Sequence, residues 1–392
     1  MDTLEITIDS LSYGGAGVGR VDGIVYFVPF SCPGDKLEIN ITKTEKRYRE
    51  AEIVRVLEAS KDRIEPPCPY HGICGGCQWQ QVAYPLQVAG KEKELRSALS
   101  KAHLPEIDSK VKTCVASPKE FGYRRTARFK VEKNKETGKS DAGFFKASSR
   151  DLVKIDKCLL LDDELNKSLP EINAERPGLI GFDLFLDETG KVVPFYRFSE
   201  KDQGADFFQV NGDVNKAMME YIRTTVIEKT EGKPRILDIY CGDGNLSLQF
   251  EKDAAAVTGW DNSRTAIQRG KRRAEELKAA GSKCKIRYHE ADVVKSWKFI
   301  SGFAREADCL ILDPPRRGLK KDAARIAGLK VPMIVYVSCS PPALARDLTA
   351  FEAAGYEIEE VMPFDMFPQT YHLETVTVLK KKKKKTTPSE KS

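Results

Sequence analysis

The 392-residue sequence lacks any long hydrophobic run, and no stretch approaches the roughly 20 apolar residues that a membrane-spanning helix needs. Its first residues lack the basic segment and the apolar segment of a secretory signal peptide. We therefore expect a cytoplasmic protein without a membrane partner. In such a protein the 10 cysteines are expected to be thiols, metal ligands or catalysts, because reducing compartments disfavour disulfides.

The sequence also lacks net charge outside one terminal segment. The formal charge of +6 comes entirely from residues 380–392, which contain seven Lys and one Glu. Residues 1–379 hold 57 basic and 57 acidic side chains and sum to zero. Total charge therefore gives no argument for a nucleic-acid partner. We predict that residues 380–392 form a disordered basic tail.

The composition that is present belongs to a globular protein, with 41% apolar and 31% charged residues. The length predicts two or three domains of about 150 residues each. Residues 4–58 contain four or five short strand-like runs separated by glycine-rich turns, which predicts a small OB-like β-barrel. From residue 207, β-rich runs alternate with helical stretches, which predicts an α/β domain with a mostly parallel sheet.

A group of cysteines stands in a segment rich in proline and glycine. Short glycine loops let several thiolates converge on one centre, and a tetrathiolate suits an iron–sulfur cluster or structural zinc. The gap of five residues between the first two cysteines exceeds the usual zinc spacing and favours iron–sulfur. Cys158 is the expected fourth ligand, with Cys114 as the alternative and His71 as a further candidate. The clustered residues are Cys68, Cys74 and Cys77.

A strand, a glycine-rich turn and a distal acid give the layout of a nucleotide site. Asp238 lies in a strand that leads into Gly242 and Gly244, and Asp261 ends the next strand. The glycines allow a ligand to approach the backbone, and Asp261 can accept both ribose hydroxyls of an adenosine-type cofactor. Ser247 stands where a dinucleotide-binding motif needs its third glycine, so the pattern favours S-adenosylmethionine. A plain βα loop is the alternative.

Further strand ends carry reactive side chains. Asp313 opens an Asp-Pro-Pro-Arg motif after one buried strand, and Cys339 follows another, directly before a predicted helix at Pro341. Open α/β sheets bind ligands at such strand ends, and a helix N-terminus favours the thiolate form of a cysteine. The alternative is that Cys339 is a buried apolar residue. Glu374 precedes an apolar strand and is either a surface carboxylate or a base.

Six motifs occur in order along the chain. Together they resemble the S-adenosylmethionine-dependent RNA (uracil-5-)-methyltransferases, and most closely the iron–sulfur branch that makes 5-methyluridine in 23S ribosomal RNA. The motifs are Cys68-x5-Cys74-x2-Cys77, Phe208-Gln-Val-Asn211, Asp238-Ile-Tyr-Cys-Gly-Asp-Gly-Asn245, Asp313-Pro-Pro-Arg316, Ser338-Cys339-Ser-Pro341 and His372-Leu-Glu374.

The resemblance covers nearly the whole chain and implies its architecture. The implied fold class is α/β, with a C-terminal Rossmann-like methyltransferase domain, an N-terminal OB-like TRAM β-barrel and a central α+β iron–sulfur domain. The implied segments are 1–60 for the barrel, 61–204 for the central RNA-contacting domain, 205–379 for the methyltransferase domain and 380–392 for the basic tail.

The resemblance also implies roles for single residues. C5 of uracil is a poor nucleophile towards a methyl sulfonium, and addition of a thiolate to C6 makes C5 enolate-like. Cys339 matches the family's nucleophile, and Glu374 matches the general base that removes the C5 proton. The positions that match ligands of a 4Fe–4S cluster are Cys68, Cys74, Cys77 and Cys158. The positions that match contacts to S-adenosylmethionine are Gln209, Tyr240, Asn245, Asp261, Asp292 and Asp313.

A local excess of positive charge points to RNA. Residues 110–157 hold 14 basic and 6 acidic side chains, and aromatic residues alternate with basic ones around Arg124 and Arg125. Basic groups neutralise phosphates and aromatic rings stack on unpaired bases, although a solvated hairpin face is the alternative interpretation. We expect a monomeric enzyme acting on 23S ribosomal RNA. Transfer RNA is the alternative substrate, and a non-catalytic iron–sulfur protein that binds RNA is the alternative class.

Overall fold

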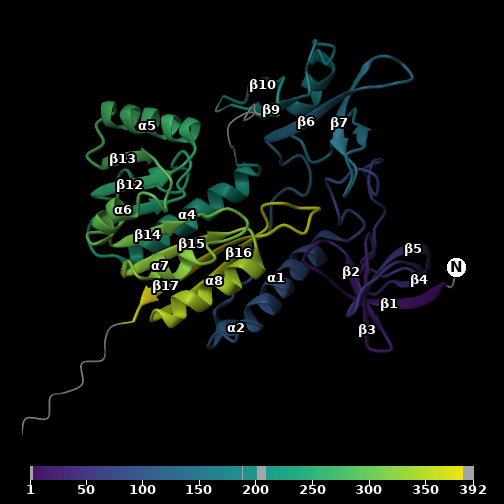
Figure 1. The fold of residues 1–392 in the computed structure, drawn as a ribbon, viewed down its shortest axis with the longest axis horizontal. Coiled ribbons are helices and arrows are strands. Elements are labelled where there is room, and N and C mark those ends of the chain that lie inside the picture. Colours follow the sequence, from purple (N-terminus) through teal and green to yellow (C-terminus); the bar gives the residue numbers. More distant parts are fainter. Residues whose placement is uncertain (1–2, 188, 201–208, 383–392) are drawn as a thin grey trace, which may run out of the picture. The chain divides into compact units, whose positions relative to one another are not determined.

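The structure, a computed structural model, describes residues 3–187, 189–200 and 209–382. The chain folds into two units, each assembled from three separate stretches (Figure 1). The first unit consists of Met1–Glu94, Cys114–Lys216 and Asp365–Leu373. The second unit consists of Leu95–Thr113, Ala217–Phe364 and Glu374–Ser392. The four-segment division expected from the sequence stays a prediction.

The first unit begins with a closed five-stranded barrel, drawn in purple and blue in Figure 1. Its strand order is β1-β2-β3-β5-β4, with β3 and β5 parallel and the other neighbours antiparallel. Alternation along the strands turns Ile6, Ile8 and Leu37 into the barrel core, where each is at most 3% exposed. The strands are β1 (Leu4–Leu11), β2 (Gly17–Val21), β3 (Ile24–Val28), β4 (Lys36–Thr44) and β5 (Tyr48–Glu58). The predicted OB-like barrel is therefore confirmed.

The same unit contains a five-stranded antiparallel sheet of order β10-β9-β6-β7-β8. Phe129 and Phe182 stack in its core with ring centroids 5.0 Å apart, and Leu165 of α3 is fully buried against them. The strands are β6 (Thr126–Lys133), β7 (Ser140–Phe145), β8 (Leu152–Lys154), β9 (Gly181–Leu186) and β10 (Val192–Arg197). The first unit also contains α3 (Asp163–Ser168), the 3-10 helix η1 (Leu169–Glu171) and the start of α1 (Tyr84–Ser100), whereas α2 (Ile107–Lys110) belongs to the second unit.

The second unit is built around a seven-stranded sheet of order β13-β12-β11-β14-β15-β17-β16. Strands β11 to β15 pair in parallel, and β17 pairs antiparallel with both β15 and β16. The order reverses at β11, because β12 lies on one side and β14 on the other, and open α/β sheets bind ligands at such a point. The predicted α/β domain is confirmed. Among the described helices, none combines the length and apolar character that crossing a bilayer requires.

The elements of this sheet and its covering helices are as follows. The strands are β11 (Arg235–Ile239), β12 (Ala256–Asp261), β13 (Lys285–Glu290), β14 (Cys309–Leu312), β15 (Met333–Ser338), β16 (Tyr356–Phe364) and β17 (Glu374–Lys381). The helices are α4 (Gly212–Lys229), α5 (Arg264–Ala279), α6 (Trp297–Ala304), α7 (Asp322–Ala327), α8 (Pro341–Ala353) and the 3-10 helix η2 (Leu248–Phe250). Strand β17 extends through Lys381, two residues into the segment predicted as a tail, and residues 383–392 lie outside the described part of the chain.

Residues 365–373 connect β16 to β17 but pack in the first unit. The ammonium of Lys91 lies 2.6 Å from Asp365 Oδ1, and both side chains are fully buried. The backbone and side chain of Gln369 exchange hydrogen bonds with Gln87, both at 2.9 Å. The amides of Gln78 and Trp79 both donate to the Gln369 carbonyl at 3.1 Å. The segment is therefore held by α1 and by the residues that follow the clustered cysteines.

Candidate active site and cysteine pocket

Three carboxylates lie at the carboxyl ends of neighbouring parallel strands in the second unit. Asp238 is part of β11, Asp261 ends β12 and Asp313 follows β14. The two oxygens of Asp261 accept hydrogen bonds from the amides of Gly242 (3.0 Å) and Ser263 (2.7 Å). Gly242 has a φ of +56°, a left-handed conformation in which glycine avoids the strain of a side chain. The acid of the second strand thus fixes the glycine turn of the first.

These carboxylates repel one another in a poorly solvated environment. Burial, with smaller contributions from Asp313 and Asp261, raises the pKa of Asp238 to about 7, and the Ser247 hydroxyl acts in the opposite direction. Burial and the charge of Asp261 also raise the pKa of Asp313 to about 7. Asp238 is completely buried, so it cannot be neutralised by solvent ions. A cationic group bound at this edge would relieve the repulsion, and the site is therefore suited to a positively charged ligand.

Cys339 and Glu374 meet at the same edge of the sheet. The antiparallel register pairs Ser338 of β15 with Thr375 of β17, which places Cys339 and Glu374 at the next position of the two chains. Burial, followed by the charges of Glu374 and Asp313, raises the pKa of Cys339 to about 12, and the charge of Arg316 acts in the opposite direction. Burial and the neighbouring Asp313 raise the pKa of Glu374 well above its ordinary value. The thiol and the two carboxyl groups form one electrostatically coupled cluster.

The expectation that the helix start favours the Cys339 thiolate is wrong for the protein without ligands. Burial and two acidic neighbours raise the thiol pKa and outweigh the effect of α8. The physical reason lies partly in the helix itself, since Pro341 and Pro342 occupy its first positions and proline has no backbone N–H to offer. The alternative of a fully buried apolar cysteine is not observed either, because Cys339 is partly exposed.

The other residues predicted to bind the cofactor in the second unit also follow strand ends. Tyr240 follows β11 with a φ of +67° and donates its amide to the Trp260 carbonyl at 2.9 Å. Burial raises the pKa of Tyr240, with contributions from neighbouring acids that include Asp292 and Asp261. Asn245 lies in the glycine turn after Gly244. Gln209 belongs to the first unit, shortly before α4, and its role stays a prediction.

Two residues at this edge were not predicted from the sequence. Tyr288 of β13 is buried, and its hydroxyl lies 2.9 Å from the Ser247 hydroxyl beneath the glycine turn. It fills the space that a side chain at Gly244 would need. Arg316 supplies the positive charge that opposes the acids around Cys339. A buried tyrosine resembles any core residue in a sequence, whereas Arg316 is the last residue of the Asp-Pro-Pro-Arg motif and could have been selected.

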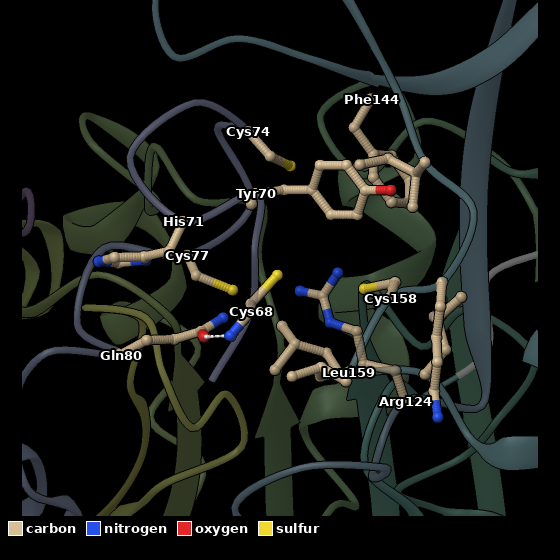
Figure 2. Close-up of a pocket in the computed structure, with 15 residues that line it drawn as sticks. Cys68, Tyr70, His71, Cys74, Cys77, Gln80, Arg124, Phe144, Cys158 and Leu159 are labelled. Carbon is tan, nitrogen blue, oxygen red and sulfur yellow. Dashed lines mark hydrogen bonds between the residues drawn. The ribbon is translucent and has the colours of Figure 1, made fainter. Parts of the chain in front are cut away.

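Four cysteines line one cavity of about 70 Å³ in the first unit (Figure 2). Cys114 is buried elsewhere, so the structure brings Cys158, the expected fourth residue, to the three clustered cysteines. His71 also lines the cavity, but its Nε2 lies 2.9 Å from Gln81 Oε1. Across the described part of the chain, no three Cys, His, Asp or Glu side chains are arranged to share a single metal ion. The cavity residues that carry thiols are Cys68, Cys74, Cys77 and Cys158.

Arg124 contributes positive charge to this cavity. Its guanidinium lies among the cysteine sulfurs in Figure 2, and its Nε is buried without a hydrogen-bond partner among the described residues. Its amide donates to the Leu160 carbonyl (2.8 Å), and its carbonyl accepts from the Asp162 amide (2.9 Å). These bonds hold Arg124 beside the segment that carries Cys158. A buried cation next to four thiols fits an anionic group in the cavity.

Comparison with known proteins identifies the chemistry of the second unit. Residues 184–382, just over half of the chain, match the sequence profile of the family described as "tRNA (Uracil-5-)-methyltransferase". The chain belongs to this family. Residues 2–54 match the TRAM domain, which corresponds to the five-stranded barrel. The chain is thus an RNA uracil-5 methyltransferase of this family, as the ordered motifs indicate.

Curated relatives are similar to the chain over nearly its whole length. An uncharacterized RNA methyltransferase of Halalkalibacterium halodurans is 28% identical, with 97% of each chain covered. The 23S rRNA (uracil(1939)-C(5))-methyltransferase of Shewanella amazonensis is 28% identical, with 95% of this chain and 94% of the relative covered. The solved tRNA (uracil-54, C5)-methyltransferase of Pyrococcus abyssi, in complex with S-adenosyl-L-homocysteine, has a TM-score of 0.69 and 24% identity. That match covers 96% of this chain and 100% of the solved one, and it establishes the fold.

Proposed function

We propose that this family member methylates C5 of a uridine in 23S ribosomal RNA, with S-adenosylmethionine as the methyl donor. The observation that carries the proposal is the convergence of Cys339, Glu374 and Asp313 at one edge of the sheet. The Shewanella amazonensis relative, whose name specifies 23S rRNA, supports the substrate. Transfer RNA is the second candidate, because the Pyrococcus abyssi structure that shares this fold acts on tRNA.

The carboxylate edge fits S-adenosylmethionine, whose sulfonium and ammonium groups are positive. Burial, with a smaller contribution from neighbouring carboxylates, raises the pKa of Asp238 and Asp313 to about 7, and a bound cation favours their charged forms. A Cβ atom added at Gly242 would meet no atom within 4 Å, so a ligand can lie against the turn. We assign Asp261 to the ribose hydroxyls. The other proposed contacts are Gln209, Tyr240, Asn245, Asp292 and Asp313.

The proposed chemistry uses two side chains. Bound S-adenosylmethionine supplies an electrophilic methyl group. The Cys339 thiolate adds to C6 of uracil, and the electron pair of the C5–C6 double bond becomes available for bond formation at C5. After C5 is methylated, Glu374 takes the C5 proton as general base, the double bond re-forms and the thiolate leaves. The target uridine must be turned out of its stack for its C6 to reach Cys339.

We further propose that the four cysteines of the cavity hold a 4Fe–4S cluster with a structural role. Support comes from four thiols that line one cavity, with the Arg124 guanidinium beside them. Such a cluster would cross-link residues 68–77 to the segment of Cys158. Anaerobically purified protein should be brown, with iron and sulfide in equal amounts. A colourless protein containing one zinc per chain would refute the cluster in favour of structural zinc.

The substrate is tested by incubating the full chain with methyl-labelled S-adenosylmethionine and RNA from a strain that lacks the enzyme. We expect 5-methyluridine in 23S ribosomal RNA and none in transfer RNA. Cys339→Ala should abolish the product, whereas Cys284→Ala, a half-buried cysteine outside the site, should retain it. Label only in transfer RNA would establish the second candidate, and full activity of Cys339→Ala would refute the covalent mechanism.

A separate prediction concerns the role of Glu374 as base. Glu374→Gln can still form the adduct but cannot remove the C5 proton, so the covalent protein–RNA species should accumulate. The measurement is the fraction of protein that migrates with RNA on a denaturing gel. Glu357→Gln, on the edge strand β16, is the matched control and should behave like the unmodified enzyme. Normal turnover by Glu374→Gln would contradict the assignment.

A further inference from the structure

We propose that the second unit has an additional RNA-binding surface, which holds a single-stranded segment of the substrate away from the target uridine. The α6–β13 surface consists of Arg235, Lys285, Arg287, Phe299 and Phe303. It lies at the amino ends of β11 and β13, whereas Cys339 and Glu374 lie at the carboxyl edge of the same sheet. The proposal rests on RNA as the substrate.

Basic side chains of this surface line a cavity of about 80 Å³. Arg235 starts β11, and Lys285 and Arg287 project from the same face of β13 because side chains alternate along a strand. Arg235 is held by an ion pair with Glu306 (2.9 Å). Lys285 and Arg287 are exposed and have no ion pair with any residue that the structure describes. Their charges are thus available to an anion such as a phosphate group.

The stretch of sequence that contains β13 and α6 also carries an excess of positive charge. Residues 264–308 contain 12 basic and 6 acidic side chains, an excess of six that the neutral sum of residues 1–379 conceals. Lys271 and Arg287 also contribute, after burial, to lowering the pKa of His289, which stands on the same face of β13. A positive potential of this kind concentrates a polyanion at the surface.

Aromatic rings stand beside these cations. Phe299 is 71% exposed, the most exposed large apolar residue in the described chain, and Phe303, one helical turn later, is 37% exposed. Phe303 lines the basic cavity and packs edge-on against Trp260, with ring centroids 5.2 Å apart. Cations next to exposed rings provide phosphate contacts and stacking surfaces for unpaired bases. Duplex RNA hides its base faces, so the arrangement favours a single strand.

The experiment compares two RNAs with full-length protein. One is the complete ribosomal RNA domain that contains the target, and the other is a short oligonucleotide that carries only the target uridine. The test variants are Lys285→Glu/Arg287→Glu and Phe299→Ala. The matched controls are Lys330→Glu, an exposed lysine elsewhere in the second unit, and Ile227→Ala, a 37% exposed apolar residue of α4.

We expect the charge-reversed double variant to bind the complete RNA at least about tenfold more weakly, with the slope of log affinity against log salt reduced by about 2. Phe299→Ala should weaken binding by roughly tenfold without changing that slope. Both variants should methylate the short oligonucleotide within about twofold of the unmodified enzyme, because the surface lies away from the active site. The controls should match the unmodified enzyme on both RNAs.

Three results would overturn the proposal. The first is unchanged binding of the complete RNA by both variants. The second is an equal loss of methylation on both RNAs, which would make the surface a support of the catalytic fold. The third is a photo-crosslinker at position 299 that captures a protein and no RNA. Failure of the unmodified enzyme to methylate either RNA would instead refute the proposed function. Binding of the complete RNA would still test the surface independently.

Discussion

At the residue scale, the acidic groups at the carboxyl edge of the second unit's sheet have raised pKa values and disfavour one another's negative charge. Glu374 and Asp313 disfavour a negative charge on Cys339, Asp313 disfavours one on Glu374, and the charge of Arg316 favours the Cys339 thiolate. A cationic ligand changes this balance, since positive charge lowers the pKa of nearby thiols. Under the proposed function, we expect binding of the methyl donor to increase the thiolate fraction of Cys339.

A prediction at this scale concerns Asp313→Asn. The carboxylate of Asp313 raises the pKa of Cys339, so its removal should lower that pKa and increase the thiolate fraction at a fixed pH. We expect iodoacetamide to alkylate Cys339 several-fold faster at pH 8 in the variant, in the absence of S-adenosylmethionine. Alkylation of Cys284 in the same sample is the internal control. An unchanged Cys339 rate would show that Asp313 does not control the thiol.

Some residues of the candidate site could be predicted from the sequence, whereas their pKa values could not. Asp238, Asp261 and Asp313 could be selected because they lie at or just after the carboxyl ends of strands, and parallel strands end at a common edge. The raised pKa of Cys339 could not be predicted, because it depends on burial and on Glu374, which is 35 residues away in the sequence. The charge of the α6–β13 surface was missed because its basic residues are spread over helices and strands that only the fold brings together.

At the element scale, the 365–373 segment belongs to one unit while its flanking strands belong to the other. The barrel and the parallel sheet were predictable, because their alternation and strand–helix order are local patterns. The position of the 365–373 segment could not be predicted, because it depends on contacts with Gln87, Lys91 and Trp79. These residues lie more than 270 positions earlier in the sequence. Contacts at such separation leave no periodic signal in a single sequence.

The buried pair of Lys91 and Asp365 gives a prediction for this element. Burial lowers the pKa of Lys91, and Asp365 acts in the opposite direction by favouring the charged form. Lys91→Met leaves Asp365 buried without its cation, which should lower the free energy of unfolding by about 3–5 kcal/mol. Urea denaturation measures the change. The double variant Lys91→Met/Asp365→Leu should recover most of the loss, and an additive loss would contradict a direct pairing.

At the scale of the whole molecule, half of the net positive charge comes from residues 383–392, beyond the last strand. Residues 383–392 contain four Lys and one Glu, so truncation after Lys382 halves the formal charge. Lys381 must be retained, because its amide donates to the Pro332 carbonyl and its ammonium lies over the Tyr356 ring. Lys381 is thus part of the last strand of the second unit.

We expect the truncated chain to methylate its RNA with an unchanged turnover number. Its non-specific affinity for RNA should fall, with a smaller dependence on salt, because fewer counterions are released. The comparison is made with the full-length chain at two salt concentrations. Truncation after Leu379 is the contrasting variant and should lower the melting temperature, because it removes the end of β17. Equal melting temperatures of the two truncated chains would contradict a structural role for the last residues of β17.

The discontinuity of the first unit has a consequence for how the chain is made. Its last stretch, Asp365–Leu373, leaves the ribosome only after the second unit's sheet has been almost entirely synthesised. Until then, Lys91, Gln87 and the backbone amide of Trp79 lack the partners that they have in the finished protein. The segment that begins with the clustered cysteines therefore cannot reach its final form early in translation. Completion of the first unit waits for a segment that is synthesised more than 270 residues after its partners.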